Sequence, residues 1–143
     1  MTGGAPLAPS ARRVQAALDA LGHAESRVRE LDVPARTAQE AADALGVPVG
    51  AIAKSLVFRA ASGSAVMVVA AGDRRVDEAK VGAAFGEPIG RADAAFVREA
   101  TGYAIGGIPP LGHATSLVLF VDASLARFQA VWAAGGTPHA VFP

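Results

Sequence analysis

The segment from Tyr103 to His113 has the residue types most suggestive of a binding or catalytic loop. It contains three glycines, two adjacent prolines and a histidine, and it lies between two apolar runs. Glycine lets a backbone adopt positive φ or approach a ligand closely, whereas proline fixes φ and removes a hydrogen-bond donor. We therefore predict a rigid loop whose glycine N–H groups form a concavity for an anion or a carbonyl oxygen. A tight connection between two strands is the alternative interpretation.

Lys54 is the most informative single side chain. It lies in the run Ile52–Arg59, which has the apolar and β-branched composition of a strand. Because side chains alternate along a strand, Lys54 shares one face with Leu56 and Phe58. A lysine in that position either extends its ammonium group to water or offers its charge to an anionic or carbonyl-bearing ligand. The sequence leaves both interpretations open.

The three histidines do not form a metal-binding pattern. His23, His113 and His139 lie far apart and no His-x-x-x-His pair occurs, so we expect neither a metal nor a cofactor. His113 directly follows the Gly/Pro loop and is the histidine expected to line a pocket. A triad of Ser116, His113 and Asp122 is conceivable, but no Gly-x-Ser-x-Gly motif supports it. Asp122 is better explained as a helix cap.

Cap and turn signals indicate which elements position these residues. The pattern Thr37-Ala38-Gln39-Glu40 predicts a capping box, and Ser62-Gly63-Ser64 predicts the turn of a β-hairpin. The predicted helices follow Ser10, Thr37, Asp77, Asp93 and Asp122, and the predicted strands cover 25–31, 52–59, 65–71, 116–121 and 139–142.

Two of these elements have further consequences. The strand 65–71 is nearly all apolar, so we expect it to be covered on both faces. The last predicted helix carries Leu125, Phe128, Val131 and Trp132, with Trp132 in the core, and it ends at Gly135-Gly136. That glycine pair either stops the helix or approaches a ligand.

The chain length and the mixture of predicted helices and strands indicate one mixed α/β domain over residues 1–143, with residues 1–9 frayed. The chain is 52% apolar and 18% charged, as expected for a globular protein. The charges of thirteen basic and thirteen acidic residues cancel. This balance argues against binding along a long nucleic acid but allows contact with a short nucleic-acid end. The absence of cysteine excludes disulfides, thiolate metal sites and thiol nucleophiles. With no apparent membrane span or signal peptide, we expect a soluble cytoplasmic protein.

Three stretches, taken in order, resemble the YbaK-type aminoacyl-tRNA editing domains, which are similar to the insertion domain of bacterial prolyl-tRNA synthetases. They are Ile52–Phe58, Gly106–His113 and Val121–His139, and the second contains the family's Gly-x-x-x-Pro loop as Gly106 to Pro110. The resemblance covers roughly residues 37–143. It implies a curved mixed β-sheet or barrel surrounded by helices. It also implies hydrolysis of the ester that joins a wrong amino acid to tRNA, typically tRNA for proline.

The resemblance assigns the site to the region between the family lysine and this loop. Lys54 would hold the terminal phosphate or the ester carbonyl, and the amides of Gly106 and Gly107 would stabilise the oxyanion with no protein nucleophile. The expected substrate-binding residues are Ile108, Pro109, Pro110, His113 and Gly135.

One departure from the family bears on the substrate. Some members place Cys or Ser before the last proline of the loop, whereas this chain has Ile108-Pro109. The more apolar loop suggests a small side chain such as Ala or Cys. The expected partners are the acceptor end of aminoacyl-tRNA and a prolyl-tRNA synthetase, with the chain a monomer or homodimer. The alternative is a non-catalytic module that only captures aminoacyl-tRNA ends or nucleotides.

Overall fold

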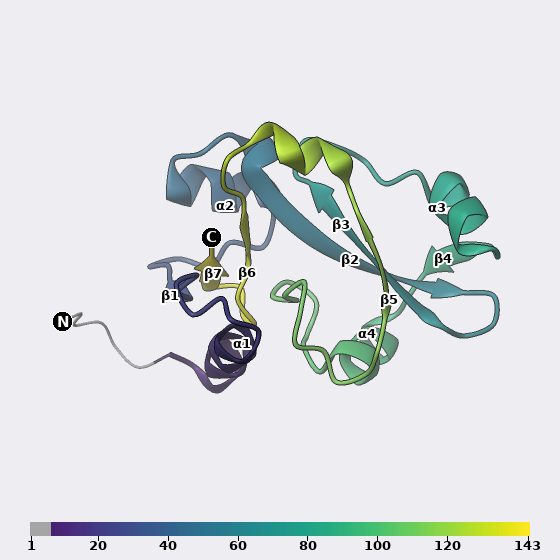
Figure 1. Ribbon diagram of the computed structural model, residues 1–143, viewed down its shortest axis with the longest axis horizontal. Coiled ribbons are helices and arrows are strands. Elements are labelled where there is room, and N and C mark those ends of the chain that lie inside the picture. Colours follow the sequence, from purple (N-terminus) through teal and green to yellow (C-terminus); the bar gives the residue numbers. More distant parts are fainter. Residues whose placement is uncertain (1–6) are drawn as a thin grey trace.

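One mixed β-sheet organises the chain, and the computed structural model describes it over residues 7–143 (Figure 1). Its strands are β1 (Arg29–Glu30), β2 (Ile52–Ala60), β3 (Ala65–Ala71), β4 (Ile89–Arg91), β5 (Val118–Val121), β6 (Trp132–Ala134) and β7 (Ala140–Phe142). They follow the order β1-β7-β6-β2-β3-β5, and β4 pairs with the far end of β2. The predicted mixed α/β architecture is confirmed, and the described strands form an open sheet and not a closed barrel.

Strand β2 is central because it pairs with three other strands. It forms the predicted hairpin with β3, in which Lys54 lies opposite Ala70. Its first residues run parallel to β6, and its last residues run antiparallel to β4. Every residue of β3 after Ala65 is buried, so the expectation that this apolar strand is covered on both faces is confirmed. Lys54 therefore lies near the middle of the sheet.

Four helices and two 3₁₀ turns surround the sheet within residues 7–143. They are α1 (Pro9–Ala20), α2 (Ala38–Leu45), η1 (Val49–Ala51), α3 (Glu78–Phe85), α4 (Ala94–Thr101) and η2 (Ala123–Arg127). Thr37, Asp77 and Asp93 cap α2, α3 and α4 as predicted, because each side chain accepts a backbone N–H of the first turn. In Figure 1, α1 and α4 lie below β2, and the green segment after α4 rises between them.

Two predicted helices differ from the structure. Helix α1 begins at Pro9, with Ala8 as its N-cap residue, so Ser10 lies inside the first turn. A proline at the first helical position already has a helical φ, which favours a start before Ser10. The helix predicted after Asp122 is only the short η2 turn, because Phe128 is extended at φ −113° and ψ 146°.

Trp132 consequently lies on a strand and not on a helix. It belongs to β6, where it lies opposite Ile52 of β2, and it is half-buried. Pairing with the sheet satisfies the backbone there and outweighs the helical spacing of the apolar residues, which is a weak local preference. The three-residue strand β4 was not predicted, because Ile89-Gly90-Arg91 lacks the apolar run of a strand.

The main core lies between the sheet, α1 and the segment after α4, and it includes Val14, Met67 and Tyr103. Leu7 also packs against this core. The rest of the predicted frayed segment, residues 1–6, lies outside the described residues. No helix of the described chain is long and apolar enough to cross a membrane.

Candidate functional site

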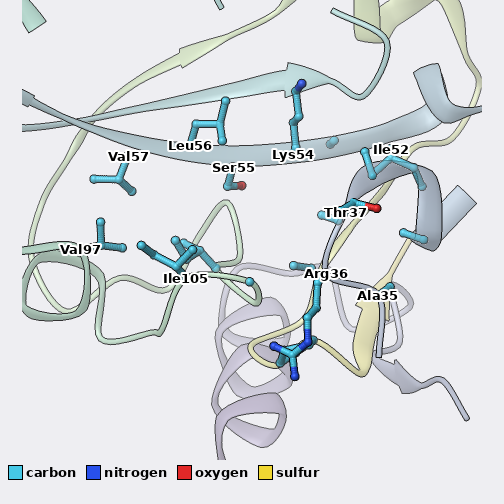
Figure 2. A pocket seen from close by; sticks show the side chains of 18 of the residues that line it. Ala35, Arg36, Thr37, Ile52, Lys54, Ser55, Leu56, Val57, Val97 and Ile105 are labelled. Atoms are coloured by element: carbon cyan, nitrogen blue, oxygen red, sulfur yellow. The ribbon is translucent and has the colours of Figure 1, made fainter. Parts of the chain in front are cut away.

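A cavity of about 700 Å³ lies between β2, the 103–113 loop and the residues that lead into α2 (Figure 2). Its walls come from segments that are far apart in the sequence. They include Ala35, Arg36, Thr37, Lys54, Ser55, Val57, Arg91, Val97, Ile105, Gly106, Ile108, Trp132, Thr137 and Pro138. Most of these side chains are apolar, and a small number of polar groups interrupts them, as is usual in binding sites for small molecules.

Neighbouring residues of β2 point to opposite sides of the strand. Figure 2 shows Lys54 and Leu56 on one side, and Ser55 and Val57 on the side that faces Val97 and Ile105. This arrangement is the strand alternation expected from the sequence. Lys54 and Gly106 line the same cavity, but the ammonium group of Lys54 points to the face opposite Ser55. The loop side of the cavity is therefore lined mainly by apolar residues, and the ammonium group of Lys54 lies on the other side of the strand.

The charged groups that line the cavity are mostly cations, although the whole chain has no net charge. They are Arg36, Lys54 and Arg91, against the single carboxylate of Glu78. In Figure 2, Arg36 and Lys54 extend in opposite directions, so they mark two sides of the cavity. A low-polarity cavity with an excess of positive charge attracts an anion such as a phosphate group.

The capping box of α2 positions one edge of the cavity. The Thr37 hydroxyl accepts the N–H of Glu40 at 3.1 Å. The Glu40 carboxylate in turn accepts the N–H groups of Thr37 at 3.1 Å and Arg36 at 2.9 Å. These three hydrogen bonds fix the backbone of Arg36 and Thr37 where both residues line the cavity.

The Gly/Pro loop is held against the turn between β6 and β7. Gly106 has φ +103°, a conformation that strongly favours glycine. Gly107 lies so close to Thr137 that a Cβ atom on it would be 2.6 Å from the Thr137 Cα. The carbonyl of Gly107 accepts the N–H of Gly136 at 2.9 Å. The sequence prediction of a rigid, shaped loop agrees with these contacts.

Both ends of this loop are also anchored. Arg13 of α1 lies over the buried ring of Tyr103, with its guanidinium carbon 4.5 Å from the ring centre. At the other end, His113 Nε2–H donates to the carbonyl of Pro109 at 2.7 Å. A carbonyl oxygen can only accept, so this bond places the proton on Nε2.

The residues expected to form the site fall into two groups. Lys54, Gly106 and Ile108 line the cavity. The cavity lining does not include the remaining residues, which belong to the loop or to the neighbouring turn: Gly107, Pro109, Pro110, His113 and Gly135. Gly135, for example, donates its N–H to Ala140 at 2.7 Å and packs against Val28 and not against the cavity.

The backbone N–H groups of the loop differ in whether they are free to bind a ligand. The N–H of Gly107 donates to Ala104 at 3.3 Å, which is long for such a bond. No described residue accepts a hydrogen bond from the N–H of Gly106 or Ile108. These two residues line the cavity, so their amides are candidate donors to a carbonyl oxygen or an anion.

The Ser116–His113–Asp122 arrangement does not form a triad. His113 is bonded to Pro109, and Ser116 is exposed. Asp122 accepts the N–H groups of Ser124 at 2.8 Å and Ala71 at 3.1 Å, which supports its interpretation as a cap. Within residues 7–143, no group of three or more histidine, aspartate or glutamate side chains could hold a metal ion.

Several cavity residues were not predicted from the sequence. Ile105 is 58% exposed at the rim, and Trp132 contributes a wall while Arg29 stacks on its ring at 4.5 Å. The Ser55 hydroxyl oxygen is buried and has no hydrogen-bond partner among the described residues. The strand alternation that placed Lys54 also placed Ser55 on the opposite face, and this was the one signal that could have identified it.

The part of the chain that forms the cavity matches a known protein family. A family model for the aminoacyl-tRNA editing domain matches residues 32–143. The uncharacterized protein YwhH of Bacillus subtilis (strain 168) is 38% identical over 113 residues, which are 79% of this chain and 72% of that protein.

Two solved structures share the whole fold. One is the crystal structure of a candidate trans-editing enzyme for prolyl-tRNA synthetase, with 48% identity and a TM-score of 0.90 over 96% of this chain and 87% of that one. The other is the crystal structure of hypothetical protein APE2540, with 34% identity and a TM-score of 0.84 over 91% of this chain and 86% of that one.

Proposed function

The chain belongs to the family of aminoacyl-tRNA editing domains, and we propose that it is a free-standing deacylase that removes a wrong amino acid from tRNA for proline. The reaction is hydrolysis of the ester between the amino acid and the terminal ribose, which yields the free amino acid and uncharged tRNA. A solved structure with 48% identity is that of a candidate trans-editing enzyme for prolyl-tRNA synthetase, which supports this choice of substrate. The proposal also implies a cytoplasmic location, where tRNA is charged.

The observation that carries this proposal is the two-sided cavity. Its apolar side, next to Val57, Val97 and Ile108, suits a small aminoacyl side chain, while Lys54 supplies a cation on the other side of β2. An aminoacyl-tRNA end has the matching pair of features, a small side chain and a phosphodiester backbone. Because the ammonium group points away from the loop, we assign Lys54 to the terminal phosphate and not to the ester carbonyl.

The loop amides supply the proposed oxyanion stabilisation. The N–H groups of Gly106 and Ile108 have no described acceptor, so they can donate to the ester oxygen as it gains negative charge. Gly107 would join them by giving up its long bond to Ala104. Water is the nucleophile, and the neighbouring ribose hydroxyl can assist it, because an aminoacyl ester held in position needs no covalent protein nucleophile.

The proposed site residues outside the cavity lining act by holding the loop in place. Pro109 and Pro110 restrict its backbone, and His113 closes it through the bond to Pro109. Gly135 precedes Gly136 and Thr137, the two residues through which the turn contacts the loop. We therefore assign substrate contact to Ile108, and positioning roles to these four residues.

The apolar lining favours a small amino acid such as Ala or Cys. A hydrophobic pocket separates substrates by only about 1–3 kcal/mol per methylene group, so we expect some activity on neighbouring small amino acids. Specificity for one tRNA would then come from the acceptor end or from an associated prolyl-tRNA synthetase.

The first experiment measures release of amino acid from tRNA for proline charged with Ala, Cys, Ser or Thr, with Pro-tRNA as the control. We expect rapid loss of at least one small amino acid while Pro is retained. Equal loss of Pro would contradict an editing role. Binding of the charged tRNA without any loss would instead favour the alternative of a non-catalytic capture module.

A further inference from the structure

A second pocket of about 460 Å³ adjoins the main cavity on the cationic side of β2. The two share four lining residues, namely Lys54, Leu56, Phe58 and Glu78. The remaining wall of the second pocket is the segment 72–76, which connects β3 to α3. The ammonium group of Lys54 points to this side of the strand, so it lies where the two pockets meet.

The 72–76 segment adds two arginines to Lys54. Arg74 and Arg75 are exposed, and both line the second pocket. Asp73 and Glu78 line this pocket with them, and Asp77 and Asp122 line an adjoining pocket that the two arginines also border. Arg74 has only a long contact of 3.9 Å to Asp73, and no carboxylate in residues 7–143 forms an ion pair with Arg75 or Lys54. The pocket therefore keeps cations that are available to an anionic ligand.

Asp73 does not neutralise this group, because Arg127 of η2 already occupies its carboxylate. Arg127 donates from Nη1 to Oδ2 at 3.0 Å and from Nη2 to Oδ1 at 2.8 Å, a bidentate pair. Its Nε also donates to the carbonyl of Ser124 at 2.6 Å, so the guanidinium group is held at both ends. The hydrogen bond from Arg127 holds the pKa of Asp73 below its ordinary value of 3.8.

Backbone packing restrains the same segment further. A Cβ atom on Gly72 would overlap the carbonyl oxygen of Val49 in η1. A Cβ atom on Gly50 would lie 2.9 Å from Asp73 Oδ2 and 3.1 Å from Arg127 Nη2. Figure 1 shows η2, in yellow-green, lying across the ends of β2 and β3. The start of the segment is thus fixed between η1 and η2.

We propose that the Asp73–Arg127 pair is a clamp that holds the 72–76 segment so that Arg74 and Arg75, beside Lys54, bind phosphodiester groups of the single-stranded tRNA 3′ end. This inference rests on the proposed function and names where the nucleic-acid backbone lies. The amino acid enters the main cavity, and the backbone continues past Lys54 into the second pocket. Arginine suits this role because its planar fork matches phosphate oxygens.

The first test compares the Arg74→Ala/Arg75→Ala double variant with Arg98→Ala, which removes a cation from the exposed face of α4 outside both pockets. The probe is an uncharged acceptor-stem RNA that ends in CCA, with binding measured by fluorescence anisotropy at several salt concentrations. We expect the double variant to weaken binding roughly tenfold and to lower the salt slope by about 0.7 for each lost phosphate contact. Arg98→Ala should leave the slope unchanged.

A second substrate separates phosphate binding from other effects. Aminoacyl-adenosine carries the same ester but no phosphate. The double variant should raise KM for mischarged tRNA at least tenfold more than it raises KM for aminoacyl-adenosine. Equal losses on both substrates would overturn the inference, because they would indicate a distorted cavity and not lost phosphate contacts.

The clamp is tested by Arg127→Ala, since Arg127 lines neither pocket. We expect weaker RNA binding and a lower salt slope, only partly restored by Arg127→Lys, which cannot form the bidentate pair. Combined with the Arg74→Ala/Arg75→Ala change, it should add little further loss, because both changes remove the same contacts. Full additivity would show that Arg127 acts independently and would overturn the positioning role.

These outcomes are distinct from those of the deacylation experiment. If RNA binding depends on Arg74 and Arg75 while no ester is hydrolysed, the proposed function fails and the phosphate site stands. If esters are hydrolysed while both variants bind RNA as the unmodified chain does, the phosphate site fails and the proposed function stands. Thermal unfolding of each variant identifies any general loss of structure.

Discussion

The backbone of Gly107 lies directly on that of Thr137, thirty residues further along the chain. A Cβ atom at position 107 would come within 2.6–2.7 Å of three backbone atoms of Thr137, and the adjacent Gly136 N–H donates to the Gly107 carbonyl at 2.9 Å. The Gly/Pro loop and the turn between β6 and β7 therefore hold each other in place. This contact determines where the amides of Gly106 and Ile108 meet the cavity.

Gly107→Ala is expected to displace the loop. Overpacking of this kind costs about 1–3 kcal/mol, and a shift of the amides should lower the deacylation rate by more than tenfold. Urea unfolding and single-turnover deacylation measure the two effects. Gly90→Ala is the matched control, since a Cβ atom there meets nothing within 4 Å. Full activity of Gly107→Ala would mean that the loop amides are not the oxyanion donors.

Lys54→Ala should reduce deacylation of mischarged tRNA by about a hundredfold, because the charge that positions the substrate through its terminal phosphate is lost. Lys54→Arg keeps the charge and should retain part of the rate. The chain's other lysine, Lys80, lies exposed on α3, so Lys80→Ala serves as the control. Ser116→Ala should not change the deacylation rate either. A large loss of rate in that variant would support a mechanism with Ser116 as nucleophile.

Ser55→Ala should leave the free energy of unfolding unchanged or raise it by up to about 1 kcal/mol. The buried hydroxyl oxygen has no hydrogen-bond partner among the described residues. Its removal therefore loses no hydrogen bond and removes the cost of burying an unpaired polar group. Thr101→Val is the contrasting variant, because its buried hydroxyl bonds Val97 at 2.8 Å and Tyr103 N–H at 3.0 Å. That change should cost about 1–3 kcal/mol. Equal destabilisation of both variants in urea would mean that Ser55 has a partner.

Asp73→Asn should lessen the acid sensitivity of the fold. The bond from Arg127 lowers the folded-state pKa of Asp73 below 3.8, so the folded protein binds fewer protons than the unfolded chain near that pH. The stabilisation is therefore complete above pH 3.8 and is lost as the pH falls through the lower folded-state pKa.

Thermal unfolding between pH 2.5 and pH 7 tests this expectation. Because the pair is partly exposed, the unmodified chain should exceed Asp73→Asn by a few degrees at most at neutral pH, and the two curves should converge in acid. A difference that grows as the pH falls would have the wrong sign for a lowered pKa.

The local elements of this protein follow from short stretches of sequence. The caps at Thr37, Asp77 and Asp93 and the Ser62–Ser64 hairpin turn each depend on a few neighbouring residues and on backbone bonds between them. Strand alternation likewise placed Lys54 and Ser55 on opposite faces. Such signals are readable because the interactions that satisfy them lie within one turn of chain.

The candidate site depended on tertiary structure. Trp132 lies on β6 and not on a helix because it pairs with Ile52, eighty residues away, and that pairing outweighs its local apolar spacing. The Asp73–Arg127 pair likewise joins residues 54 positions apart. The sequence by itself determined the family resemblance, the strand face on which Lys54 lies and the rigidity of the Gly/Pro loop. Only the tertiary structure decided which residues share the cavity. Burial and strand pairing act between segments that are far apart in the sequence, and short sequence patterns do not show which distant segments will meet.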